Sequence, residues 1–226
     1  MKIGIDLGPA NTVARLDFSA GEKWVTEAGA MIAMSPGLEI DTSTHQKGKG
    51  GLLKGLKRMF GGESFFLNHY TANQDSSLYL APTMPGDIIC HQLNGDRIVA
   101  QAGSFLACDS NLDVETGWQG FKNILSGESL FWLNISGSGQ VLLSSYGAIY
   151  EVDINGEYTV DTGHIVAFEE TLSFNLSKAG SSWLHSVMGG EGIVCKFQGQ
   201  GKLWCQSHNL SSFGHSLTPH LRPKKR

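Results

Sequence analysis

This chain contains few charged residues and few prolines, and both shortages limit the structural class of protein to which it can belong. Charged side chains make up 17% of the 226 residues and only 6 residues are prolines, whereas hydrophobic residues reach 41%. Disordered chains carry more charge and too little apolar surface to form a core, so this composition predicts a folded protein. The 29 glycines favour many short strands joined by glycine turns over a helical bundle.

Cysteine is also scarce, and its spacing suggests no metal site. The cysteines Cys90, Cys108, Cys195 and Cys205 include no CxxC pair. A chain of this length does not need disulfides to hold a core, and the missing spacing argues against structural zinc. The histidines are scattered, without a zinc-binding pair or a GxSxG nucleophile motif. We therefore predict no metal, no cofactor, no catalytic residue and no enzymatic activity.

Long apolar runs and a leader segment are absent as well. No run approaches the length of a membrane span, and the N-terminal MKIGIDLGPA lacks a continuous apolar stretch and a cleavage site. These features predict a cytoplasmic protein. The formal net charge of -4 gives no general attraction for nucleic acid or for anionic membranes, so we do not expect a nucleic acid partner.

Two phosphate-binding patterns are incomplete. The stretch IGIDLGPANTVA at Ile3 is similar to the first phosphate loop of actin-like and Hsp70-like ATPases, but those folds need two lobes and further nucleotide loops. Gly50 and Gly55 have the separation of a P-loop. Leu56 and Lys57 follow, whereas a P-loop needs Lys and then Ser or Thr directly after the second glycine. Neither stretch predicts nucleotide binding.

What the sequence does contain is a pattern that occurs three times. The stretch AGAMIAMSPGLEIDT from Ala28 aligns without a gap with AGSFLACDSNLDVET from Ala102 and TGHIVAFEETLSFNL from Thr162. A Gly-Glu or Gly-Asp pair precedes each stretch, and an anchor of the type GES or GEG follows it. Three anchors in one order indicate internal repeats. The anchors share a recurring carboxylate, at Glu63, Glu128 and Glu191.

Each repeat predicts about six short strands. TVARLDF, DIICHQL and AIYEVDI alternate as half-buried strands do, and the following AGE, NGD and NGE indicate tight turns. SGSGQ and QGQGK lie between apolar segments and predict hairpins. Cys195 and Cys205 align with Leu133 and Leu143 of the second repeat, which predicts small apolar core residues facing each other across the third hairpin.

These strands predict an all-β fold, a β-sandwich with three internal repeats. A lone repeat would leave an apolar sheet face exposed, so the three repeats are expected to pack about a pseudo-threefold axis. We predict one β domain at 1–215, with repeats at about 12–83, 84–147 and 148–213, and a basic C-terminal tail at 216–226.

The motifs GAMIAM, GGLLKGLKRMFGGES, GDI, SGSGQVLLSSYGAI, VDTGHIVAFEE and GEG, in this order, resemble one known family. It is the bacterial and archaeal group whose yeast member is altered-inheritance-of-mitochondria protein twenty-four, a mitochondrial biogenesis family. The resemblance runs from about Thr12 to about Phe213. It implies repeats like the subunits of the tryptophan RNA-binding attenuation protein (TRAP-like), no established enzymatic activity, and a link of the mitochondrial member to inner-membrane organisation. The first repeat departs from the pattern, with ANQDSS where relatives tend to have glycines.

Between its anchors each repeat carries an insert with large apolar residues, and the first insert is also basic. Such side chains either close the end of the sandwich as a cap or stay exposed to contact a membrane surface, another protein or a second copy. The candidate contact residues are Leu52, Leu53, Lys54, Leu56, Lys57, Arg58, Met59, Phe60, Trp118, Phe121, Trp183 and Leu184.

The recurring carboxylates leave two interpretations. Each can accept backbone N–H bonds that close a turn, or the three can form a ring that binds a cation or a basic partner. Together, the patterns predict a non-enzymatic scaffold or adaptor that self-associates, with an unidentified protein partner and with a membrane-peripheral location as an open alternative. The second functional hypothesis is a small-ligand or RNA-binding module, by analogy with the TRAP-like fold alone.

Overall fold

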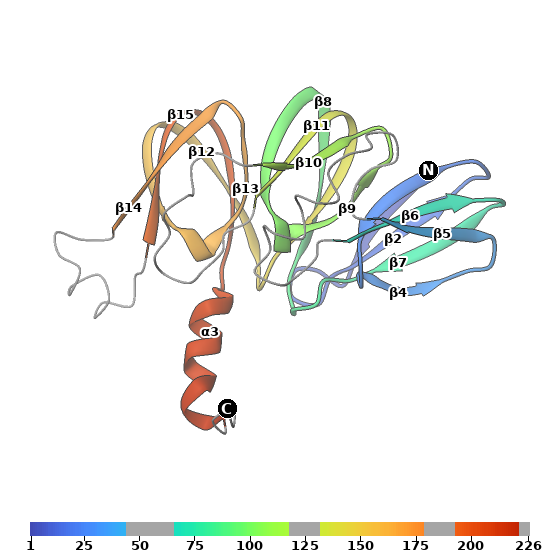
Figure 1. Cartoon of the computed structure of the whole chain (residues 1–226), viewed down its shortest axis with the longest axis horizontal. Helices are drawn as coiled ribbons and strands as arrows, with labels where there is room; N and C mark the ends of the chain where they lie inside the picture. Colours follow the sequence, from blue (N-terminus) through green and yellow to red (C-terminus); the bar gives the residue numbers. More distant parts are fainter. Residues whose placement is uncertain (44–65, 118–131, 179–192, 222–226) are drawn as a thin grey trace.

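The protein is described by a computed structural model, in which residues 1–43, 66–117, 132–178 and 193–221 are placed. About two thirds of these residues lie in strands that pair antiparallel, which confirms the predicted all-β class. The strands form three groups that lie side by side in a row, and a C-terminal helix projects from the last group (Figure 1).

The first group is built by the N-terminal part of the chain. Its strand β2 has the burial alternation that the sequence predicts, with Ala14, Leu16 and Phe18 buried and the residues between them half-buried. The strands of this group are β1 (Lys2–Asp6), β2 (Val13–Phe18), β3 (Lys23–Glu27), β4 (Met31–Met34), β5 (Leu38–Ser43), β6 (Leu67–Ala72) and β7 (Ser76–Leu80).

The middle and last groups contain longer strands. The middle group holds β8 (Ile88–Gln101), the short helix η1 (Ala102–Ser104), β9 (Phe105–Asp109), β10 (Asp113–Gly117) and β11 (Trp132–Ser144). The last group holds β12 (Ile149–Asp161), η2 (Thr162–His164), β13 (Ile165–Glu169), β14 (Leu172–Lys178) and β15 (Ile193–Gln206), followed by α3 (Leu210–Leu217) and η3 (Thr218–His220).

Two sheets connect these strands. A four-stranded sheet has the order β1-β2-β7-β4, and an eleven-stranded sheet has the order β12-β15-β13-β8-β11-β9-β3-β6-β5, with β10 beside β11 and β14 beside β15. Hydrogen-bonded pairing therefore joins neighbouring groups at β3–β9 and at β8–β13. The pseudo-threefold arrangement of three TRAP-like repeats and the domain limits stay predictions.

The predicted hairpins at SGSGQ and QGQGK are wrong. Both segments lie inside the continuous strands β11 and β15, and NGD and NGE likewise lie inside β8 and β12. The glycines bend these strands: Gly137 has a φ of 118° and Gly199 a φ of 131°. The strands do not fold back on themselves because their two halves have different partners. The first half of β11 pairs with β10 and the second half with β9.

The predicted role of two cysteines is confirmed, but their placement is not. Cys195 and Cys205 are buried free thiols, as small apolar core residues are. They do not face each other across a hairpin, because both lie on β15, where Cys195 is opposite Val160 and Cys205 opposite Tyr150 of β12. Burial raises the pKa of Cys195 to about 12 and that of Cys205 to about 11, so neither is a reactive thiolate.

Candidate functional site

The contact residues predicted from the sequence lie outside the described residues. This holds for the apolar and basic candidates Leu52, Leu53, Lys54, Leu56, Lys57, Arg58, Met59, Phe60, Trp118, Phe121, Trp183 and Leu184, and for the recurring carboxylates Glu63, Glu128 and Glu191. Their roles stay predictions, and the candidate site is built from the residues that the structure places.

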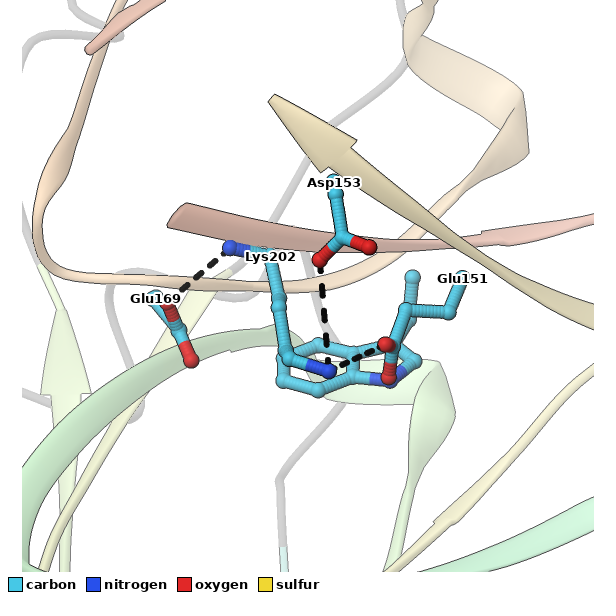
Figure 2. A network of polar contacts seen from close by, with 5 residues as sticks. Glu151, Asp153, Glu169 and Lys202 are labelled. Atoms are coloured by element: carbon cyan, nitrogen blue, oxygen red, sulfur yellow. Dashed lines mark hydrogen bonds and ion pairs between the residues drawn. The ribbon is translucent and has the colours of Figure 1, made fainter. Parts of the chain in front are cut away.

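A polar network connects three strands of the last group (Figure 2). The ammonium of Lys202 on β15 pairs with Oε1 of Glu151 on β12 and lies 4.0 Å from Oδ1 of Asp153. The backbone N–H of Lys202 donates to Oε2 of Glu169 at the end of β13, at 2.9 Å. The indole Nε1 of Trp204 donates to Oε2 of Glu151 at 3.0 Å. The network thus ties β12, β13 and β15 together.

The charges of this network are mutually paired and partly open to solvent. The hydrogen bond to Glu151 raises the pKa of the Lys202 ammonium, which therefore stays charged across the physiological range. Solvent-exposed ion pairs contribute about 0–1 kcal/mol each to stability. Because the carboxylates already accept bonds within the protein, we interpret the network as a structural clamp rather than as a catalytic centre.

A histidine lies beside this clamp. The ring of His91 on β8 is 4.7 Å from that of Trp204 in an edge-to-face arrangement, and its Nε2 is buried without a hydrogen-bond partner among the described residues. Burial lowers the pKa of His91, so the ring is neutral near pH 7. Within the described residues, no group of three or more His, Cys, Asp or Glu side chains is placed to hold a metal ion.

An exposed apolar surface lies on β4. Ile32 is 55% and Met34 43% exposed, and all four residues of the strand are exposed. Among the described strands, β4 is the last strand of its sheet and has β7 as its only neighbour. The sequence predicts this strand correctly, but it aligns with two strands, β9 and β13, whose apolar residues are buried.

A second open edge lies at the other end of the row. Within the part of the chain that the structure describes, strand β12 pairs with β15 alone and ends the eleven-stranded sheet. Its residue Tyr158 is 43% exposed, whereas Ile98 at the corresponding place on β8 is fully buried. Strands β4 and β12 are therefore sheet edges in the first and last groups of the row.

The C-terminal helix was not anticipated from the sequence. Leu210, Phe213 and Leu217 lie on one side of α3 at helical spacing, and all three are exposed. The side chain of Asn209 caps the helix by accepting from the N–H groups of Ser211 and Ser212. An asparagine followed by apolar residues at this spacing was the signal available in the sequence. Among the described helices none is long and apolar enough to cross a membrane.

A half-buried carboxyl at the end of β3 makes the stability of the fold depend on pH. Burial raises the pKa of Glu27 to about 7. The folded protein therefore holds this proton more tightly than the unfolded chain does. The stability that the protonated group contributes is fully present below pH 4.5 and is lost as the pH rises through about 7.

We predict that Glu27→Gln stabilises the protein at pH 8 by about 1–2 kcal/mol and has little effect at pH 4. Thermal unfolding at both pH values measures the difference. The matched control is Glu22→Gln, because a hydrogen bond from the N-terminal amino group lowers the pKa of Glu22 and its removal should not stabilise at pH 8. An equal shift of Glu27→Gln at both pH values would contradict the assignment.

Residues 5–208 match the model of a family described as mitochondrial biogenesis AIM24. An uncharacterised protein of Streptococcus pyogenes serotype M6 is 29% identical over 98% of this chain and 91% of its own length. A crystal structure of a Streptococcus pyogenes protein, determined by structural genomics, is similar with a TM-score of 0.80, at 28% identity over 97% of this chain and 99% of that one.

Proposed function

The chain belongs to the mitochondrial biogenesis AIM24 family, and we propose that it acts as a non-enzymatic scaffold that associates with further copies of itself. One observation carries this proposal. Strand β4 is an uncharged apolar strand at a sheet edge, and its side chains are exposed. Natural proteins normally protect such edges with charges or prolines, because an open apolar edge recruits another strand. An edge that is left unprotected is explained if a partner covers it.

We further propose that three equivalent repeats build the row. Three matching registers support this: Ala33 of β4 is opposite Tyr79, Ala107 of β9 opposite Leu142, and Ala167 of β13 opposite Trp204. Each pairing also skips one residue directly before that alanine. The three alanines are the ones that coincide in the sequence alignment. An irregularity at the same aligned position in three segments supports a common repeat structure over three chance irregularities.

The apolar residues of β4 supply a driving force of suitable size. Complete burial of a side chain such as Ile32 or Met34 contributes about 1.5–3 kcal/mol. Association also costs translational and rotational freedom, so a few such residues with strand pairing favour a reversible assembly. This matches a scaffold that assembles and disassembles with concentration.

We predict that the wild-type protein sediments as a species larger than its 24.4 kDa monomer and that Ile32→Asp shifts it to the monomer. Sedimentation velocity over a range of concentrations measures both. The control is Ile40→Asp, a similarly exposed residue on β5, which should leave the assembly unchanged.

Flotation with liposomes of anionic and neutral composition distinguishes the alternative of a membrane surface. If the wild type is a monomer at every concentration, the self-associating scaffold is wrong. If that monomer also floats with vesicles and Ile32→Asp abolishes flotation, the exposed strand contacts lipid instead.

A further inference from the structure

Two junctions inside the chain have the same register. At the first, β3 pairs antiparallel with β9 through Trp24↔Asp109, Val25↔Cys108 and Thr26↔Ala107. At the second, β8 pairs antiparallel with β13 through Ile98↔Glu169, Val99↔Phe168 and Ala100↔Ala167. In the repeat alignment β3 and the end of β12 correspond to the end of β8, and we call these strands β8-like. Strands β4 and β13 correspond to β9, and we call them β9-like. Each junction therefore joins the end of a β8-like strand in one group to a β9-like strand in the next group along the chain.

This pairing pattern leaves one β9-like strand and one β8-like strand without a partner strand in another group. In the first group the β9-like strand is β4, which pairs with β7 alone. In the last group the β8-like strand is β12, which pairs with β15 alone. No pairing between β4 and β12 occurs among the described strands, and the two strands belong to groups at opposite ends of the row (Figure 1).

Burial at equivalent positions shows what each open edge lacks. Leu106 and Val166 are fully buried, whereas the equivalent Ile32 is exposed. Trp24 and Ile98 are buried, whereas the equivalent Tyr158 is exposed. The positions that are buried at the two internal junctions are therefore exposed at the equivalent places on β4 and β12.

We propose that β4 of one copy pairs antiparallel with the end of β12 in a second copy, in the register Ser35↔Tyr158, Met34↔Thr159 and Ala33↔Val160. The proposal rests on the self-association proposed above and specifies its surface and register. The two edges differ, so the contact is heterologous, and successive copies extend the row head to tail. Such a row closes into a ring or grows as a filament, depending on the rotation between copies.

Edge chemistry within the first group supports the choice of β4. Strand β5 also ends a sheet, but it carries the acidic residues Glu39 and Asp41, which discourage pairing with another chain. Strand β4 has the sequence MIAM and carries no charge. The other end of the four-stranded sheet is β1, which carries Lys2 and Asp6, so β4 is the edge that accepts a strand.

The contact between copies is expected to be weaker than the internal junctions. At the second internal junction the N–H of Glu170 donates to the carbonyl of Arg97 at 3.2 Å, and the two side chains form an ion pair at 2.9 Å. The position equivalent to Glu170 is Pro36, which has no N–H, and the position equivalent to Arg97 is Glu157. Both contacts are lost between copies.

The first test mixes two blocked variants. Met34→Asp blocks β4 and leaves β12 intact, whereas Thr159→Asp blocks β12 and leaves β4 intact. We expect each variant alone to be a folded monomer, and the equimolar mixture to form a dimer through the one intact β4 and the one intact β12. Sedimentation velocity measures the masses, and circular dichroism checks folding.

The outcomes separate this proposal from the proposed function. A wild type that is monomeric at all concentrations overturns both. An oligomeric wild type with Met34→Asp or Thr159→Asp still oligomeric alone overturns the head-to-tail pairing and leaves self-association standing. A dimer that survives Thr159→Asp but not Met34→Asp indicates a contact between two β4 strands instead.

The second test is a cross-link that does not depend on destabilising the edge. Cys90 is the exposed native thiol among the cysteines, so the background is Cys90→Ser. Chains with Met34→Cys mixed with chains with Thr159→Cys should form a disulfide between copies, because directly opposite residues place their Cβ atoms within bonding reach.

Replacing Thr159→Cys by Tyr158→Cys in the second partner is the control for the register. That residue points to the other face of the strand and should give at least ten-fold less cross-link. Equal yields would overturn the register. A disulfide formed within a single chain that carries both cysteines, in a monomeric protein, would overturn the contact between copies.

Discussion

Replacement of Gly86 by alanine is expected to destabilise the protein by about 4 kcal/mol or more, among the largest effects of a single methyl group. A Cβ at this position would lie 1.7 Å from the carbonyl oxygen of Ser145. The backbone cannot move aside, because both segments are held by hydrogen bonds. The N–H of Ser145 donates to the carbonyl of Asp87 at 3.1 Å, and the N–H of Asp87 donates to that of Gly147 at 3.0 Å.

Gly103→Ala is the matched control for this substitution. No heavy atom of the described residues lies within 4 Å of the position of a Cβ added at Gly103, and its backbone does not require a positive φ. We expect a change within about 0.5 kcal/mol. Denaturant unfolding followed by far-UV circular dichroism compares the two variants with the wild type. If Gly86→Ala unfolds at the same midpoint as Gly103→Ala, the close approach of the two segments is wrong.

Gly86 also illustrates what the sequence could and could not predict. The motif PGD before DIICHQL indicates a turn, and the alternation after it indicates a strand, since both signals are local. The requirement for glycine comes from Ser145, which is distant in the sequence. The same limit explains the wrong hairpins: Gly137 permits either a reversal or a bend, and the bend results from pairing with β9 and β10, which no local pattern records.

The exposed surface on β4 was not predicted from the sequence, and the contact residues that were predicted lie outside the described residues. The sequence indicates large apolar side chains in the inserts as contact residues, and it predicts MIAM as one of three equivalent strands. Apolar alternation indicates that a strand can be buried, but burial also needs a neighbour. Strands β9 and β13 have neighbours on both sides, whereas β4 stands at the start of the row and has one. Exposure of Met34 therefore follows from position in the row, which only the structure supplies.

Phe168→Ala is expected to lower the free energy of unfolding by about 3–5 kcal/mol, the range for deletion of a buried aromatic ring. Phe168 is 2% exposed. Its ring lies 5.1 Å from that of Phe197, 5.3 Å from Phe174 and 5.6 Å from Trp132, all in edge-to-face arrangements. Removing it leaves a cavity and ends these aromatic contacts. The same deletion at the exposed Phe66 is the control and should cost less than about 1 kcal/mol. Equilibrium unfolding in denaturant measures both.

Met34 occupies the position on β4 that Phe168 occupies on β13, so a third variant separates burial within one chain from burial between copies. Because Met34 is exposed in the single chain, Met34→Ala should cost less than about 1 kcal/mol when unfolding is measured at concentrations where the protein is monomeric. It should weaken association when the protein is concentrated, since the side chain is then covered by the second copy. A monomer destabilised by Met34→Ala as strongly as by Phe168→Ala would mean that β4 is already packed within its own chain. In that case the edge is not free, and neither the proposed scaffold contact nor its head-to-tail register holds.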